Sequence, residues 1–201
     1  MTLKAPFPWF GGKRDAAPDV WRALGRVSNF VEPFFGSGAV LLARPRETWA
    51  TPDAPGTETV NDASRFLANF WRALKWAPAD VAEHAEWPVN ECDLHARHRR
   101  LAERLPELRA LLDADPEAFD AKAAGWWVWG ASCWIGDGWC EEERSETRSL
   151  HRKLPELGSN RGVRSERASD LRAYLAALSE RLRGVRVACG DWSRVCGDST
   201  T

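Results

Sequence analysis

The chain has 201 residues, of which 44% are hydrophobic and 28% are charged, and its formal net charge at pH 7 is −1. This composition excludes a disordered chain and allows one hydrophobic core, with room for a subdomain. The net charge excludes attraction of the whole chain to nucleic acid, and no apolar run approaches the length of a membrane span.

The sequence of residues 1–14 predicts an extended arm with a turn at Gly11-Gly12. These residues contain no apolar segment of the kind that directs export. Residues 15–26 predict a helix. The five cysteines are not closely paired, which indicates reduced thiols in a cytosol. Cys92, His95 and His98 have spacings that suit metal ligands, but no fourth ligand of the right kind lies near them, and we expect no metal site.

The first predicted strand, Val27–Val31, is a run of the kind found in buried parallel sheets. Residues 32–38 follow it with the sequence Glu-Pro-Phe-Phe-Gly-Ser-Gly, and an apolar stretch, Ala39–Ala43, comes next. The pattern predicts a strand, a tight glycine loop and the start of a helix, so that a ligand can lie against bare backbone. On this motif alone, an ordinary strand-to-helix turn is an equal alternative.

The second predicted strand, Thr57–Asn61, ends at an acidic residue and leads into a predicted amphipathic helix, Asp62–Trp76. Asp62 falls 24 positions after Gly38. This is close to the spacing at which nucleotide sites place a carboxylate on ribose hydroxyls. The pattern predicts an adenosine-containing cofactor, and the alternative for Asp62 is an ordinary helix N-cap.

The glycine loop favours a cofactor without a pyrophosphate. A dinucleotide loop needs a third glycine for close helix packing, and Leu41 stands at that position. The aromatic pair Phe34-Phe35 also differs from the usual dinucleotide loop. S-adenosylmethionine, which carries no phosphate, suits the loop better, and a nicotinamide-dependent oxidoreductase is the disfavoured alternative.

Residues 77–184 show no alternation of strands and helices. Leucines recur on one helical face around Pro106, which breaks or starts a helix. Five of the twelve tryptophans lie between Gly125 and Cys140, and we expect them to form a core. The sequence of residues 145–165 predicts a basic loop. The basic cluster at residues 95–100 predicts a solvated helix face, and the alternative is a face that contacts DNA phosphates.

The last predicted helix ends at Gly184, and Val185–Cys189 then alternates as a strand. Gly190-Asp191-Trp192 follows that strand directly. A sheet domain is therefore predicted to be interrupted by a mostly helical insertion.

The chain resembles the Dam-like DNA adenine-N6 methyltransferases through four motifs that stand in the family's order: Trp-Phe-Gly-Gly-Lys at residues 9–13, the glycine loop at 32–38, Asn61-Asp62, and Gly190-Asp191-Trp192. The resemblance spans nearly the whole chain. It implies an α/β fold with a Rossmann-like methyltransferase sheet, S-adenosylmethionine as cofactor and double-stranded DNA as partner. It also implies site-specific adenine methylation, as in restriction-modification, in the cytoplasm of a prokaryote or a phage-infected cell.

The resemblance implies a role for each candidate cofactor residue. Lys13 pairs with the methionine carboxylate, and its alternative is a surface lysine. Asp62 accepts the ribose hydroxyls. Asp191 accepts from the adenine amine with Trp192 against that ring, and the alternative for Asp191 is a turn residue. The remaining expected contacts come from Trp9, Phe35, Gly36, Ser37 and Gly38.

In the family, target recognition falls in the interval of the helical segment. We therefore expect residues 1–76 to bind the cofactor, 77–184 to recognise DNA, and 185–201 to return to the catalytic sheet. Arginines bind phosphate and read guanine, and the expected DNA contacts are Arg144, Arg148, Arg152, Lys153, Arg161 and Arg164. The alternatives are a solvated basic face, and one or two tryptophans that wedge beside a flipped base.

The family's catalytic tetrapeptide, Asp-Pro-Pro-Tyr, does not occur in the sequence, so no catalytic residue is assigned. The chain stops nine residues past Trp192, where the family continues into the catalytic strand. We expect a sheet that is incomplete at its C-terminus, a marginal fold and an exposed edge near Val185–Cys189. The alternative function is a non-catalytic S-adenosylmethionine- or DNA-binding fragment that a second chain completes.

Overall fold

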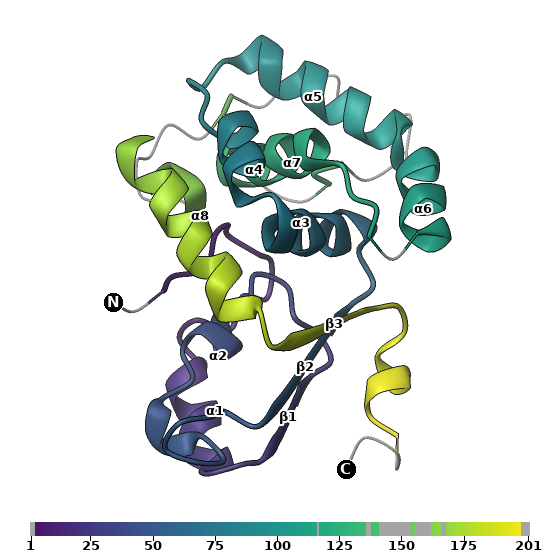
Figure 1. Cartoon of the computed structure of the whole chain (residues 1–201). Helices are drawn as coiled ribbons and strands as arrows, with labels where there is room; N and C mark the ends of the chain where they lie inside the picture. The colour runs from purple at the N-terminus through teal and green to yellow at the C-terminus, as the bar shows by residue number, and fades with distance from the viewer. Residues whose placement is uncertain are drawn as a thin grey trace.

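The structure is a computed structural model that describes residues 3–115, 117–135, 138–140, 154–155, 162–165 and 168–197. A small sheet with two helices beside it lies below a layer of helices (Figure 1). The helices are α1 (Ala17–Leu24), α2 (Ala39–Leu42), α3 (Arg65–Trp76), α4 (Pro78–Ala85), α5 (Glu91–Glu103), α6 (Leu105–Ala114), α7 (Ala121–Cys133) and α8 (Ala168–Leu182). The 3-10 turns are η1 (Arg46–Thr48), η2 (Gly162–Ser165) and η3 (Trp192–Val195).

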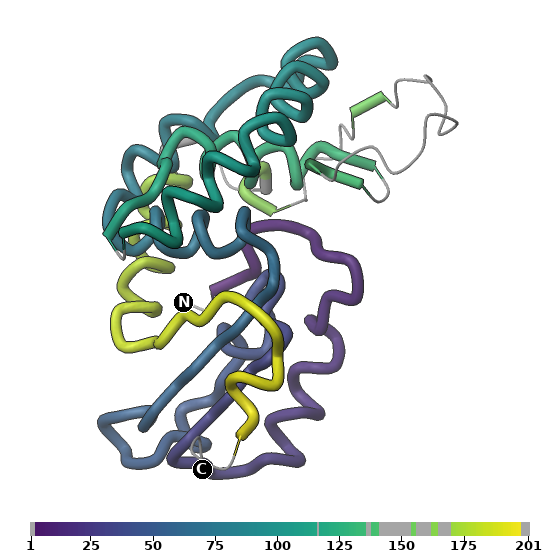
Figure 2. The backbone as a smooth tube through the Cα atoms, turned by 90° about the vertical axis from the view of Figure 1, so that its right-hand side faces the viewer, coloured from purple at the N-terminus to yellow at the C-terminus, as the bar shows by residue number. Residues whose placement is uncertain are grey.

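The sheet has three parallel strands in the order β1 (Asn29–Glu32), β2 (Thr57–Asp62) and β3 (Val185–Cys189) within the described residues. Because the strands are parallel, their carboxyl ends meet at one edge, beneath the helical layer (Figure 2). The predicted α/β class is confirmed, and β3 lies at a sheet edge, as expected. The marginal stability of the fold stays a prediction.

The first strand begins later than the sequence suggested. The Val27 amide donates to the Thr48 carbonyl at 3.2 Å, so it is turned away from the ladder. The ladder starts where the Thr57 amide donates to Ser28 at 2.9 Å. The predicted start of the helix Asp62–Trp76 was also wrong, because Asp62 still belongs to β2 and the Ser64 hydroxyl caps α3.

Helix α3 joins the sheet to the helical layer. Its apolar face is buried, with Phe70 and Leu74 at 0% exposure, and it contacts β3 as well as α4, α6, α7 and α8. A single core therefore runs from the strands into the helices. Burial of this amphipathic stripe is the main force that holds the two layers together.

The helical layer follows the leucine and tryptophan patterns. Pro78 begins α4 directly after α3. Pro106 lies in the first turn of α6, where proline fits, and this confirms that it starts a helix. Trp127 and Trp129 are buried, which confirms them as core residues. The solvated-face prediction is wrong at Arg97, which is 7% exposed and lies 4.3 Å from the centre of the Trp129 ring.

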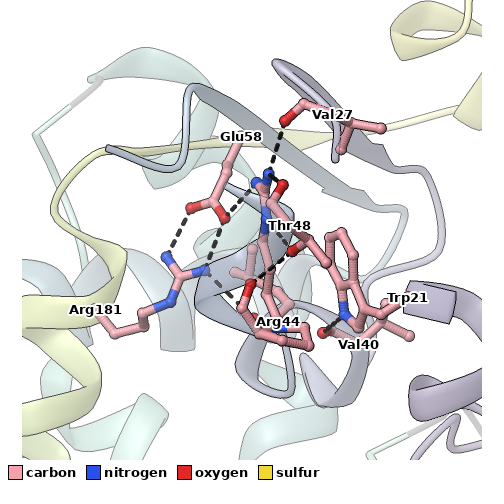
Figure 3. A network of polar contacts seen from close by, with 9 residues as sticks. Trp21, Val27, Val40, Arg44, Thr48, Glu58 and Arg181 are labelled. Atoms are coloured by element: carbon pink, nitrogen blue, oxygen red, sulfur yellow. Dashed lines mark hydrogen bonds and ion pairs between the residues drawn. The ribbon is translucent and has the colours of Figure 1, made fainter. Parts of the chain in front are cut away.

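A buried ionic network fixes the sheet to its neighbouring helices (Figure 3). The Glu58 carboxylate on β2 pairs with Arg44 at 3.0 Å and with Arg181 of α8 at 2.7 Å. Arg44 also donates to the carbonyls of Val27 and Thr48, both at 2.9 Å. The network thus ties β2 to α8 and to the segment after α2.

None of the helices in the described ranges is long and apolar enough to cross a membrane.

Candidate functional site

The carboxyl ends of the three strands are locked together by hydrogen bonds. The Phe35 amide donates to the Asn61 carbonyl at 2.8 Å, and the Gly190 amide donates to the Asp62 carbonyl at 3.1 Å. The buried Asn61 side chain donates to the carbonyls of Pro33 and Gly190, both at 3.0 Å. The predicted motifs after β1, β2 and β3 are therefore neighbours, and Asn61 is a structural member of the site whose role the sequence analysis missed.

The loop between β1 and α2 needs its glycines. Gly36 and Gly38 adopt φ values of 52° and 75°, a region that side chains disfavour. A Cβ atom on Gly36 would lie 2.5 Å from Cδ1 of Trp9, because the N-terminal arm crosses over the loop. Trp9 thus lies beside the loop, as predicted, and covers its backbone.

We expect Gly36→Ala to weaken the fold more than Gly11→Ala. Both positions have a positive φ, but a Cβ on Gly11 meets nothing within 4 Å. The free energy of unfolding of the Gly11 variant should fall by about 1–2 kcal/mol because of backbone strain. The free energy of unfolding of the Gly36 variant should fall by about 1–2 kcal/mol more than that, because Trp9 must move. Urea unfolding of both variants measures the difference, and equal losses would mean that Trp9 does not constrain the loop.

Asp62 holds the glycine loop from below. Its Oδ2 accepts the Gly36 amide at 2.9 Å, and its Oδ1 accepts the Ser64 amide at 3.0 Å. A carboxylate has about four acceptor positions, so both oxygens keep capacity for hydroxyl groups of a ligand. The N-cap alternative for Asp62 is not what the structure has, because Ser64 caps α3.

Lys13 reaches from the arm to the end of β1. Its Nζ donates to the Phe34 carbonyl and lies 3.1 Å from Oε1 of Glu32. The Lys13 side chain is 35% exposed, whereas that of Glu32 is 5% exposed. Burial raises the pKa of Glu32 to about 7, and the nearby Lys13 ammonium only partly offsets this. Glu32 was missed as a site residue, although an acid at the end of a buried strand is a detectable signal.

Asp191 and Trp192 follow β3 at the rim of the site. The Asp191 carboxylate accepts the amide and the hydroxyl of Ser193, and these bonds hold its pKa below the usual range. The carboxylate is also fully exposed. The Trp192 ring is 50% exposed and lies 6.3 Å from the ring of Phe34, which is 62% exposed. Two exposed aromatic rings thus stand together beside Asp191.

Phe35 and Ser37, the other two predicted residues of the loop, differ in which of their atoms a ligand can contact. The Phe35 ring is 2% exposed and packs 5.0 Å from Trp71, so only its backbone can face a ligand. Ser37 lines a hollow of about 350 Å³ together with Trp9, Gly12 and Arg14. The volume is within the range of small-molecule sites. Asp62 and Asp191 do not line this hollow, which lies on the side of the arm.

Five of the six predicted DNA contacts lie outside the described residues: Arg144, Arg148, Arg152, Lys153 and Arg161. Arg164 is described, in the turn η2. This turn is fixed to the arm, because the Val163 amide donates to the Pro6 carbonyl at 2.7 Å, and Gly162 lines the hollow. Within the described ranges, no group of three or more His, Cys, Asp or Glu side chains could hold a metal ion.

Comparison with known proteins finds similarity in the first half of the chain. Residues 9–102 match the family described as D12 class N6 adenine-specific DNA methyltransferase. Two curated proteins named DNA adenine methylase, from Vibrio cholerae serotype O1 strains O395 and El Tor Inaba N16961, are each 33% identical over 89 residues. The aligned segment is 44% of this chain and 29% of each relative. The resemblance to adenine methyltransferases is confirmed over residues 9–102, a range that includes Lys13 and Asp62.

Proposed function

We propose that the carboxyl ends of β1, β2 and β3 bind S-adenosylmethionine, and that the protein methylates the N6 amine of adenine in DNA. The observation that carries the proposal is the Asp62 carboxylate, which is held against the backbone of a glycine loop by the Gly36 amide. A half-buried carboxylate beside bare backbone fits the ribose of an adenosine ligand. When bound, the sulfonium group supplies the methyl group.

The ends of the proposed site fit the two ends of this ligand. Lys13 has three N–H donors and uses one on Phe34 and one on Glu32, so the third can pair with a carboxylate. At the other end, Asp191 can accept from an adenine amine, and the exposed rings of Phe34 and Trp192 can cover the base. The hollow beside Trp9 would take the methionine portion.

The proposal that DNA is the substrate rests on the similarity of residues 9–102 to the family of adenine-specific DNA methyltransferases. We assign target recognition to residues 77–184. The helices α4–α7 lie over the carboxyl ends of the strands, where an adenine must reach the cofactor (Figure 1). The basic segment that includes Arg144 and Arg161 leads into Gly162, which lines the hollow. An enzyme of this kind works where its DNA lies, in the cytoplasm of a prokaryote or an infected cell.

Calorimetric titration tests the cofactor site. We expect S-adenosylmethionine to bind with saturation and NAD to give no heat of binding, because Leu41 replaces the glycine that a pyrophosphate loop needs. Binding of NAD alone would point to an oxidoreductase instead. If neither S-adenosylmethionine nor NAD binds, the proposed cofactor site is refuted.

A second candidate function follows from the Asp-Pro pair in the sequence, Asp115-Pro116, which is followed by Glu117 and not by the Pro-Tyr of the family's tetrapeptide. In this alternative, the chain binds S-adenosylmethionine or DNA, and a second chain supplies the group that orients the adenine amine. Transfer of labelled methyl groups to duplex DNA by the purified chain alone would exclude this alternative.

A further inference from the structure

Asn61 is a buried side chain that joins the segments after β1 and β3 at one end of the proposed site. It is 1% exposed, and its Nδ2 donates to the carbonyls of Pro33 and Gly190, both at 3.0 Å. The Oδ1 of the same amide has no hydrogen-bond partner among the described residues. An unpaired buried acceptor lowers the stability of a fold, so stability alone does not account for an asparagine at this position.

The two carbonyls that Asn61 holds lead directly into residues at the rim of the site. A carbonyl group is coplanar with the amide of the next residue, so Asn61 fixes the peptide planes that enter Phe34 and Asp191. Gly190 has a φ of 151°, and a glycine restricts the direction of the chain little by itself. Hydrogen bonds therefore set the direction in which the chain leaves β3, and Asn61 donates one of them.

The Asp191 carboxylate keeps acceptor positions for a ligand. Both bonds that it accepts from Ser193, one from the amide and one from the hydroxyl, fall on Oδ1. Its Oδ2 can therefore accept a further donor, and the carboxylate is fully exposed. The exposed rings of Phe34 and Trp192 lie 6.3 Å apart beside it. Asn61 thus holds an acid and two aromatic rings in one arrangement without reaching the surface.

We propose that Asn61 is a positioning residue for the adenine of the ligand: it holds the Asp191 carboxylate where it accepts from the 6-amine, and so gives the site its preference for adenine over a purine without that amine. The proposal rests on the proposed S-adenosylmethionine site and adds to it a source of specificity. Two backbone bonds, from the Phe35 amide to Asn61 and from the Gly190 amide to Asp62, do not depend on the Asn61 side chain. A variant of Asn61 therefore keeps both segments attached, while Asp191 loses its fixed direction.

The test compares the binding of S-adenosylhomocysteine with that of its analogue that has purine in place of adenine. The wild-type protein should bind S-adenosylhomocysteine about 10- to 100-fold more tightly, because the analogue lacks the donor to a charged group. Asn61→Leu keeps a branched side chain of similar size and removes both donors. In this variant the ratio of the two affinities should fall below about threefold, because a mobile carboxylate must first be ordered before it accepts the amine.

Asn69→Leu is the matched control for a loss of structure. Asn69 is a buried asparagine of α3 that donates to the Asp120 carbonyl and accepts the Asp120 amide, both at 2.9 Å, within the helical layer. Its replacement also removes two hydrogen bonds from the core, but it should leave the ratio of the two affinities as in the wild-type protein.

A measurement on the wild-type protein covers the case in which Asn61→Leu does not fold. Hydrogen exchange of the Asn61 side-chain amide, followed by NMR, reports how firmly this amide holds its two carbonyls. S-adenosylhomocysteine should slow this exchange more than the purine analogue does, because an amine bound to Asp191 restrains the segment that Asn61 holds. Equal exchange with the two ligands at saturation would refute the positioning role.

The outcomes distinguish this inference from the proposed function. If Asn61→Leu discriminates between the ligands as strongly as the wild-type protein, Asn61 does not position Asp191. If Asn69→Leu loses the discrimination as well, the effect belongs to the fold as a whole, and the inference fails. If both ligands bind the wild-type protein equally, Asp191 does not accept the amine, so the inference fails while the cofactor site stands. If neither ligand binds, the proposed site and the inference fail together.

Discussion

Replacing Glu58 with alanine is expected to lower the free energy of unfolding by about 3–5 kcal/mol. Glu58 is 2% exposed and lies between Arg44, whose side chain is fully buried, and Arg181. The variant keeps the Arg44 guanidinium in the core without its counter-charge, since the chain around it is fixed by carbonyl contacts. An uncompensated buried charge costs far more than the net value of the pair itself.

Urea unfolding at constant pH measures this loss, and two variants calibrate it. Glu180→Ala removes the exposed ion pair with Arg183 and should change stability by less than about 0.5 kcal/mol. Glu58→Gln keeps an acceptor oxygen for the guanidinium groups and should lie between the other two variants. If the free energy of unfolding of Glu58→Ala lies within about 1 kcal/mol of the wild-type value, the Arg44 guanidinium has moved out of the core into solvent.

The second large effect is expected at Asp62. Asp62→Ala should lower the affinity for S-adenosylmethionine by about 100- to 1000-fold, because each hydrogen bond from a hydroxyl to a carboxylate contributes about 1.5–3 kcal/mol. The variant also frees the Gly36 amide, which the carboxylate now holds at 2.9 Å. The glycine loop then loses its support from β2 at the same time as the proposed ribose contact is removed.

A mutant cycle separates the two roles of Asp62. The ligand change is removal of both ribose hydroxyls, and the protein change is Asp62→Ala. If Asp62 binds the ribose, the wild-type protein discriminates strongly between the two ligands, and the variant does so weakly. If both proteins discriminate equally between the two ligands, Asp62 only supports the glycine loop. If Asp62→Ala binds S-adenosylmethionine with unchanged affinity, the proposed ribose contact is refuted.

The local sequence was sufficient for the elements that surround the site. Glycines at positions 36 and 38 predicted a tight loop, and in the structure both have a positive φ. The four-residue recurrence of Phe66, Phe70 and Leu74 predicted α3, because a helix that buries one face must repeat its apolar residues at that spacing. These predictions depend on chain geometry within a few residues. The order of the motifs similarly pointed to adenine methyltransferases, which the comparison confirms for residues 9–102.

The sequence could not show which side chains turn inward. It grouped Arg97 of α5 with a solvated basic cluster, whereas its guanidinium lies against the rings of Trp87, before α5, and of Trp126 and Trp129 in α7. It named Phe35 for the cofactor site without showing that its ring packs on Trp71, which leaves only its backbone for a ligand. Burial is a property of the neighbours that a residue meets, and those neighbours come from distant parts of the chain.

The sequence by itself determined the strand, loop and helix pattern and the order of the glycine and acidic motifs. Only the tertiary structure decided that Lys13 faces Glu32, that Asn61 joins the ends of β1 and β3, and that Glu58 is enclosed by two arginines. Each of these contacts links residues far apart in the chain. Their energies depend on desolvation and distance, which exist only after the layers have packed.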